Sequence, residues 1–113
     1  RDKSFIIGRK RTLELIMTGE LIDATKALEI GLINKLVPDR DLLNESFKYA
    51  KGLAEKSPVA LKMGKKSFYQ MEDLKFADAL ELTNYHFATL CTTQEGQEGV
   101  KAFLEKRKAS WNK

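Results

Sequence analysis

The sequence predicts a mainly α-helical protein. Apolar residues recur at helical intervals along most of the chain, and a glycine, a proline or an N-capping side chain stands at the ends of most of these segments. Only residues 32–37 have the pattern of a strand. With 113 residues, 42% of them hydrophobic, the chain is long enough for a single domain with one modest core.

Two short helices are expected near the N-terminus. Apolar side chains share one face over residues 11–18, and Gly19 can end that helix in the left-handed conformation. Asp23 can accept backbone hydrogen bonds as the N-cap of a second helix over residues 24–30. Gly31 then closes the second helix in the same way as Gly19 closes the first.

A strand or extended link is expected next, over residues 32–37, ended by Pro38. After it, Asp39 or Asp41 can cap a longer helix that runs to about Lys56, because its apolar residues recur at helical spacing.

Two further helices follow in the second half of the chain. Ser57 can cap the first of them, and Pro58 suits its first turn, where a missing N–H costs nothing. This helix is expected to reach Met71. Asp73 can cap the second, over residues 74–91.

The predicted helix over residues 74–91 is apolar on two sides. One side carries Phe76, Ala77, Leu80, Phe87, Ala88 and Cys91, and the other carries Ala79, Leu82 and Leu90. Such a helix is normally covered on both faces, so we expect it to meet another subunit or another part of the protein. Thr92 or Thr93 caps a last helix, which a basic tail follows.

Residues for catalysis are scarce. His86 is the only histidine, which excludes a multi-histidine metal site, and a helix histidine of this kind is more often structural than catalytic. Cys91 is expected to be a buried, inert thiol. Glu95 and Glu98 stand near a helix start, where carboxylates favour the helix dipole. We therefore assign neither a catalytic residue nor a metal ligand.

Charge and cysteine content limit the class of protein. The net charge is +4, with basic clusters that suit a polyanion such as a nucleic acid or a phosphorylated cofactor, or that simply solvate helix faces. Exposed aromatics do not alternate with these clusters, so a nucleic-acid partner is disfavoured. No segment has the length and apolarity of a membrane span. A single cysteine suits a reducing compartment, the cytoplasm by default.

One local pattern indicates ligand binding. On the last predicted helix, Lys106 lies three residues and Arg107 four residues after Phe103, so an aromatic ring and two cations share one surface. A phosphorylated ligand with an apolar part needs such a pair of contacts. By spacing alone, a core phenylalanine flanked by solvated cations is the commoner arrangement.

Several motifs in order resemble the enoyl-CoA hydratase/isomerase (crotonase) family. They are LIMTGE at residues 15–20, IDA at 22–24, ALEIGLINKLVP at 27–38, SPVALK at 57–62 and EGVKAFLEKR at 98–107. Each is weak alone, but together they cover essentially the whole chain and are specific. The nearest resemblance is to short-chain enoyl-CoA hydratases and 3-hydroxybutyryl-CoA dehydratases.

The resemblance implies that residues 1–113 form the C-terminal helical (oligomerisation) domain of a crotonase-type ββα-spiral fold. Two catalytic glutamates and the oxyanion-hole N–H groups belong to the upstream spiral domain in this family, so this chain alone is expected to be inactive. Phe103 matches a phenylalanine that lines the substrate site, and Lys106 matches a lysine that reaches a coenzyme A phosphate. The substrate is a coenzyme A thioester, with no permanently bound cofactor.

The resemblance also implies a homo-oligomer, a trimer or a dimer of trimers, in the cytoplasm or the mitochondrial matrix. A noncatalytic helical interaction module, or an isomerase or other activity of the same family, remains an alternative.

Overall fold

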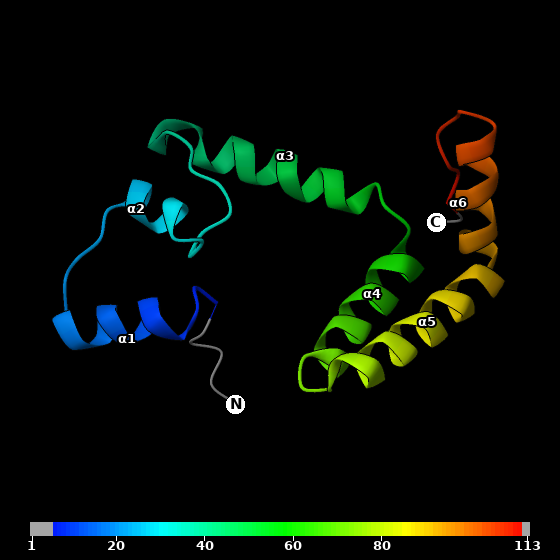
Figure 1. Cartoon of the computed structure of the whole chain (residues 1–113). Coiled ribbons are helices and arrows are strands. Elements are labelled where there is room, and N and C mark those ends of the chain that lie inside the picture. The colour runs from blue at the N-terminus through cyan, green and yellow to red at the C-terminus, as the bar shows by residue number, and fades with distance from the viewer. Residues whose placement is uncertain (1–5, 112–113) are drawn as a thin grey trace. The chain divides into compact units, whose positions relative to one another are not determined.

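All regular structure in the described part of the chain, residues 6–111 of a computed structural model, is helical (Figure 1). The helices are α1 (Arg9–Thr18), α2 (Ala24–Glu29), the 3₁₀ turn η2 (Asp39–Asp41), α3 (Leu42–Ala54), α4 (Pro58–Met71), α5 (Phe76–Thr92) and α6 (Gln94–Leu104). The prediction of a mainly α fold is confirmed.

Of the two alternatives predicted for residues 32–37, the structure has the extended link and not the strand. These residues form turns and extended chain, and residues 6–111 contain no strand with which they could pair. A strand needs a neighbour to satisfy its N–H and C=O groups. The segment is held instead at its first residue, where the Leu32 N–H donates to the Ala27 carbonyl at 2.9 Å, and at Lys35, which forms an ion pair with Glu45 at 2.8 Å.

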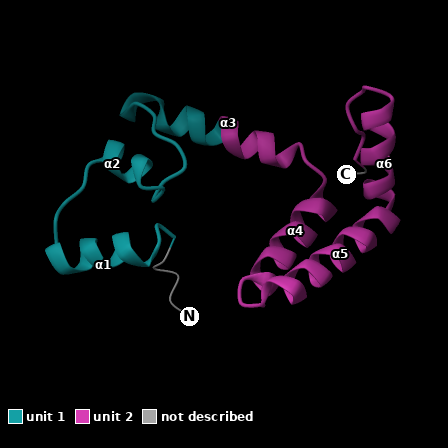
Figure 2. Cartoon of the chain, in the orientation of Figure 1, with its two compact units in different colours: residues 1–47 teal, residues 48–113 magenta. Residues whose placement is uncertain are grey.

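The chain divides into two compact units, residues 1–47 and residues 48–113 (Figure 2). In the first unit the predicted end of α1 at Gly19 and the predicted start of α2 at Asp23 are confirmed, although α1 begins two residues earlier than predicted and α2 ends one residue earlier. Gly19 is left-handed with φ 62° and donates its N–H to the Leu15 carbonyl, and Asp23 caps α2 by accepting from the Lys26 N–H at 2.7 Å. The prediction that residues 1–113 act as one domain of a larger protein stays a prediction.

In the second unit α4 and α5 lie side by side, and α6 contacts both (Figure 2). Ser57 caps α4 as predicted, by accepting from the Ala60 N–H at 3.0 Å. Asp73, by contrast, is not the cap of α5. The Leu74 N–H donates to the Met71 carbonyl in a turn that closes α4, so α5 begins only at Phe76.

The predicted aspartate cap of α3 is also wrong. Asp39 and Asp41 form the 3₁₀ turn η2, which leads directly into α3, and α3 ends at Ala54 rather than at about Lys56.

The expected apolar core is largely missing from the described residues. Ala27 and Ala102 are their only buried hydrophobic residues, whereas Phe76 is 83% exposed and Phe87 67% exposed on α5. Within the second unit, the side of α5 that carries Phe76 and Phe87 is therefore exposed, whereas Ala79, Leu82 and Leu90 on its other side are half-buried. A helix with this composition is stable in water only when its apolar side chains are covered.

Candidate ligand-binding site

The corner between α5 and α6 fixes where α6 begins. Thr93 ends α5 and caps α6: its N–H donates to the Leu90 carbonyl at 3.0 Å, and its hydroxyl oxygen accepts from the Gly96 N–H at 3.0 Å. This confirms the predicted threonine cap. A Cβ at Gly96 would overlap with the Leu90 carbonyl oxygen and lie 2.9 Å from its carbon. Only glycine fits this corner without a backbone shift.

Glu95 ties the first turn of α6 to the start of α4. Its carboxylate accepts from the Ser57 hydroxyl and from the Val59 N–H at 3.1 Å. A negative charge at a helix N-terminus is stabilised by the helix dipole and by free N–H groups. This geometry agrees with the predicted structural role of Glu95. The carboxylate stabilises the N-terminus of α4 as well as that of α6, the helix to which Glu95 belongs.

The C-terminus of α6 is a tight turn built around Lys106. The Arg107 N–H donates to the Ala102 carbonyl at 3.0 Å and the Lys106 N–H to the Phe103 carbonyl at 3.2 Å, which together form a Schellman motif. Lys106 takes the left-handed position with φ 52° and is the only non-glycine residue with positive φ in the described chain.

The same motif ends α2, but there glycine occupies the left-handed position. Gly31 has φ 81°, and the bonds from Leu32 to Ala27 and from Gly31 to Leu28 repeat the pattern. A residue with a Cβ in this conformation costs about 1 kcal/mol or more relative to glycine. Lysine at position 106 is therefore unfavourable for the turn itself, and such residues concentrate at functional sites.

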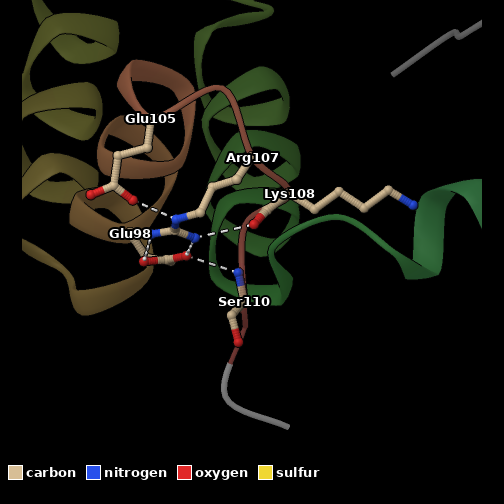
Figure 3. A network of polar contacts seen from close by, with 5 residues as sticks. All are labelled: Glu98, Glu105, Arg107, Lys108 and Ser110. Atoms are coloured by element: carbon tan, nitrogen blue, oxygen red, sulfur yellow. Dashed lines mark hydrogen bonds and ion pairs between the residues drawn. The ribbon is translucent and has the colours of Figure 1, made fainter.

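A polar cluster joins α6 to the chain that follows it (Figure 3). The Glu98 carboxylate on α6 accepts hydrogen bonds from both terminal nitrogens of Arg107, at 2.6 Å and 3.1 Å, and from the Ser110 N–H at 2.8 Å. The Arg107 Nε donates to Glu105 at 2.5 Å, and Nη1 also donates to the Lys108 carbonyl at 3.1 Å. We call Glu98, Glu105, Arg107 and the Ser110 N–H the turn clamp.

The turn clamp is intact at neutral pH. The hydrogen bond from Arg107, and then that from the Ser110 N–H, lower the pKa of Glu98 from 4.5 to about 2. The pKa of Arg107 is raised by its hydrogen bonds to Glu98 and Glu105. Because the pKa of Glu98 is lower in the folded state, its stabilising contribution is complete above pH 4.5 and is lost as the pH falls towards 2.

The structure separates the two cations that the sequence pattern grouped together. Helix α6 ends at Leu104, so neither Lys106 nor Arg107 lies on it. The Nε and both terminal nitrogens of Arg107 donate to Glu105, Glu98 and the Lys108 carbonyl, so Arg107 is not a free phosphate contact, which corrects the expectation of two such cations. The Lys106 side chain forms no hydrogen bond or ion pair with residues 6–111 and is exposed. Phe103 lies on the last turn of α6 and is 82% exposed.

Phe103 also borders an apolar hollow of about 330 Å³. Its wall includes Phe87 and Leu90 of α5, Val100 of α6 and Trp111 of the tail. The Trp111 indole N–H donates to the Glu55 carbonyl at 2.9 Å, which anchors the tail against the end of α3. The sequence pattern does not place Trp111 in the site, because nothing in its spacing indicates that the tail folds back.

The other candidate reactive groups do not form a site. Cys91 is exposed, which corrects the expectation of a buried thiol: that expectation assumed a core which α5 lacks within residues 6–111. The Nδ1 atom of His86 is buried without a hydrogen-bond partner. Residues 6–111 include no group of three or more His, Cys, Asp or Glu side chains placed to hold a metal ion, and no helix long and apolar enough to cross a membrane.

Comparison with known proteins identifies the class. A profile of the family described as enoyl-CoA hydratase/isomerase matches residues 4–113. The chain belongs to the enoyl-CoA hydratase/isomerase family.

Individual relatives agree with this assignment. Over 106 residues, 94% of this chain, it is 37% identical to the human protein named enoyl-CoA hydratase domain-containing protein 3, mitochondrial. It is also 37% identical, over 105 residues, to a probable mitochondrial enoyl-CoA hydratase 2 of Arabidopsis thaliana. Among solved structures, the enoyl-CoA hydratase of Mycobacterium smegmatis matches with a TM-score of 0.88 at 32% identity, over 94% of this chain.

The chain spans only part of these proteins. It covers 35% of the length of the human relative and of the Arabidopsis relative, and 41% of the mycobacterial structure. The fold class predicted from the motifs, a helical part of the crotonase fold, is confirmed.

Proposed function

We propose that this chain is the C-terminal helical part of an acyl-CoA lyase of the enoyl-CoA hydratase or 3-hydroxyacyl-CoA dehydratase type. Its contribution is an oligomerisation surface and part of the acyl-CoA site. The observation that carries the proposal is Lys106: an exposed ammonium group with no partner among residues 6–111, held in a left-handed turn three residues after the exposed Phe103.

The two ligand candidates have different roles in this proposal. The Lys106 ammonium binds a phosphate of coenzyme A, because a compact cation with three donors suits a phosphate oxygen. Phe103 and the apolar hollow that it borders cover an apolar part of the ligand. Neither side chain exchanges a proton with the substrate, so no residue of this chain is assigned a catalytic role.

The reaction itself belongs to a part of the whole protein outside this chain. By the resemblance, one glutamate activates water for addition to the enoyl double bond, another protonates the α carbon, and backbone N–H groups stabilise the thioester enolate. The coenzyme A thioester is the substrate, and the proposal includes neither a metal nor a permanently bound cofactor. The names of the mitochondrial relatives support a mitochondrial location, and the cytoplasm is the alternative.

The exposed apolar surface of α5 supports the proposal of a homo-oligomer, a trimer or a dimer of trimers. Exposed aromatic side chains such as Phe76 and Phe87 stabilise a protein when a second surface removes them from water. The same observation is compatible with the second candidate function, a noncatalytic helical interaction module. The reading frame distinguishes the two: an upstream segment with two catalytic glutamates supports the enzyme.

In the whole protein, we expect Lys106→Gly to raise KM for a coenzyme A thioester several-fold, about 1 kcal/mol, and to leave kcat nearly unchanged. A phosphate contact far from the reacting carbons stabilises the ground state and the transition state equally. Glycine is the most informative substitution because it also removes the strain at φ 52°, so a loss of affinity cannot come from an unstable turn.

Steady-state kinetics at two ionic strengths checks this expectation. The difference between Lys106→Gly and the parent should shrink as salt rises, and Lys106→Arg should retain most of the affinity. Lys108→Ala, which removes the neighbouring cation, is the matched control and should change KM little. A KM for Lys106→Gly that equals the parent value at low salt would show that Lys106 is only a solvated surface charge.

A further inference from the structure

Lys106 has a left-handed backbone conformation that lysine does not favour, and within residues 6–111 the Lys106 side chain makes no polar contact that stabilises this conformation. At the corresponding position after α2 the chain uses Gly31, which adopts positive φ without strain. Lys106 has no side-chain hydrogen bond or ion pair with residues 6–111 that could offset the strain. The stabilisation must come from its neighbours.

The two residues next to Lys106 in the sequence are joined to each other through the guanidinium group of Arg107. Arg107 follows it directly and donates two hydrogen bonds to Glu98; Glu105 precedes it directly and accepts from the Arg107 Nε at 2.5 Å. Glu98 also accepts from the Ser110 N–H, so the chain after the turn is drawn back along α6 (Figure 3). The turn is therefore fixed on both sides of Lys106, while the lysine ammonium has no partner in the part of the chain that the structure describes.

We propose that Glu98 and Arg107 are positioning residues for the ligand, which hold the left-handed turn so that the Lys106 ammonium faces a phosphate of coenzyme A. This inference rests on the proposed function, since it gives the clamp a purpose only if Lys106 binds phosphate. Of the two cations Lys106 and Arg107, Arg107 does not bind the ligand in this proposal, because its N–H groups donate to Glu98, Glu105 and the Lys108 carbonyl.

The sign of the effect separates positioning from simple electrostatics. Glu98 is a carboxylate near a proposed anion site, so by charge alone its removal should strengthen the binding of coenzyme A. Its removal should also release Arg107, a second cation that could then reach the phosphate. A positioning role predicts the opposite, because without Glu98 the turn relaxes and Lys106 loses its fixed direction.

The test measures the affinity of the whole protein for free coenzyme A by isothermal titration calorimetry at low salt, together with KM and kcat. We expect Glu98→Ala to weaken binding several-fold and to leave kcat nearly unchanged. Glu98→Gln keeps an acceptor oxygen for Arg107 and for the Ser110 N–H, and should recover part of the affinity. Glu105→Ala removes the same charge but leaves the two Arg107–Glu98 bonds intact, and should have the smaller effect.

The double variant Glu98→Ala/Lys106→Gly completes the cycle. It should bind no more weakly than Lys106→Gly alone, because Glu98 acts only through Lys106. If Glu98→Ala does not fold, Arg107→Lys serves in its place. This variant keeps the charges at both positions but loses the bidentate hydrogen bonds to Glu98, and it should also weaken the binding of coenzyme A.

Two different failures remain distinguishable. If Lys106→Gly weakens binding but Glu98→Ala leaves it unchanged or tighter, or if the two effects simply add, the positioning role is wrong and the proposed function stands. If Lys106→Gly itself has no effect on affinity, the proposed function of this turn is wrong and the positioning role fails with it.

Discussion

Gly96→Ala is expected to disrupt the corner between α5 and α6. The added Cβ would overlap with the Leu90 carbonyl oxygen, which already accepts from the N–H and the hydroxyl of Thr93. Backbone atoms cannot move aside as a flexible side chain can. We expect a loss of about 2 kcal/mol or more in local stability, because overpacking outweighs the roughly 1 kcal/mol that alanine gains over glycine as a helix former.

Gly99→Ala is the matched control for this effect. It lies one turn further along α6, where a Cβ would make an ordinary contact 3.6 Å from the Trp111 ring. Helix propensity then dominates, and the variant should be more stable by about 0.5–1 kcal/mol. Hydrogen exchange of the α6 amides in the whole protein reports the free energy of local opening. Equal protection of α6 in the two variants would contradict the tight corner.

The isolated 113-residue chain is expected to show no hydration of crotonyl-CoA. Among its described residues the carboxylates near the proposed ligand are engaged structurally: Glu95 at the start of α4, Glu98 and Glu105 in the turn clamp. A hydratase needs a carboxylate free to activate water beside another that protonates carbon. The absorbance of the enoyl thioester, followed over time, measures the reaction.

The whole protein provides the positive control, since the proposed function expects turnover only when the upstream part is present. Protein-dependent turnover by the isolated chain above the blank would contradict the assignment of a binding role alone. It would direct attention to a catalytic carboxylate within residues 1–113.

Local signals in the sequence predicted most helix ends correctly. Gly19, Asp23, Ser57 and Thr93 act through their own backbone conformation or through a hydrogen bond three residues away, so the information is contained in a short window. Asp73 was predicted wrongly, and the sequence did not decide between a strand and an extended link at residues 32–37, for the converse reason. A strand depends on a partner strand that is distant in the sequence. The turn that closes α4 includes Leu74, so the helix that Asp73 was expected to cap begins only at Phe76.

The candidate site was only partly predictable. Phe103 and Lys106 stood out by their spacing and by the family resemblance, but the pattern placed Arg107 beside them as an equal. Its pairing with Glu98 spans nine residues and depends on the chain reversing after Leu104. The sequence contains lysine where glycine would favour that reversal, so nothing local indicated it.

In the proposed function, the turn after α6 binds the nucleotide phosphates of the substrate rather than its reacting carbons. The most direct test compares kcat/KM for crotonyl-CoA and crotonyl-pantetheine, which lacks those phosphates, in the parent protein and in Lys106→Gly. We predict a several-fold loss with crotonyl-CoA and no loss with crotonyl-pantetheine. An equal loss with both substrates, or none with either, would contradict the claim.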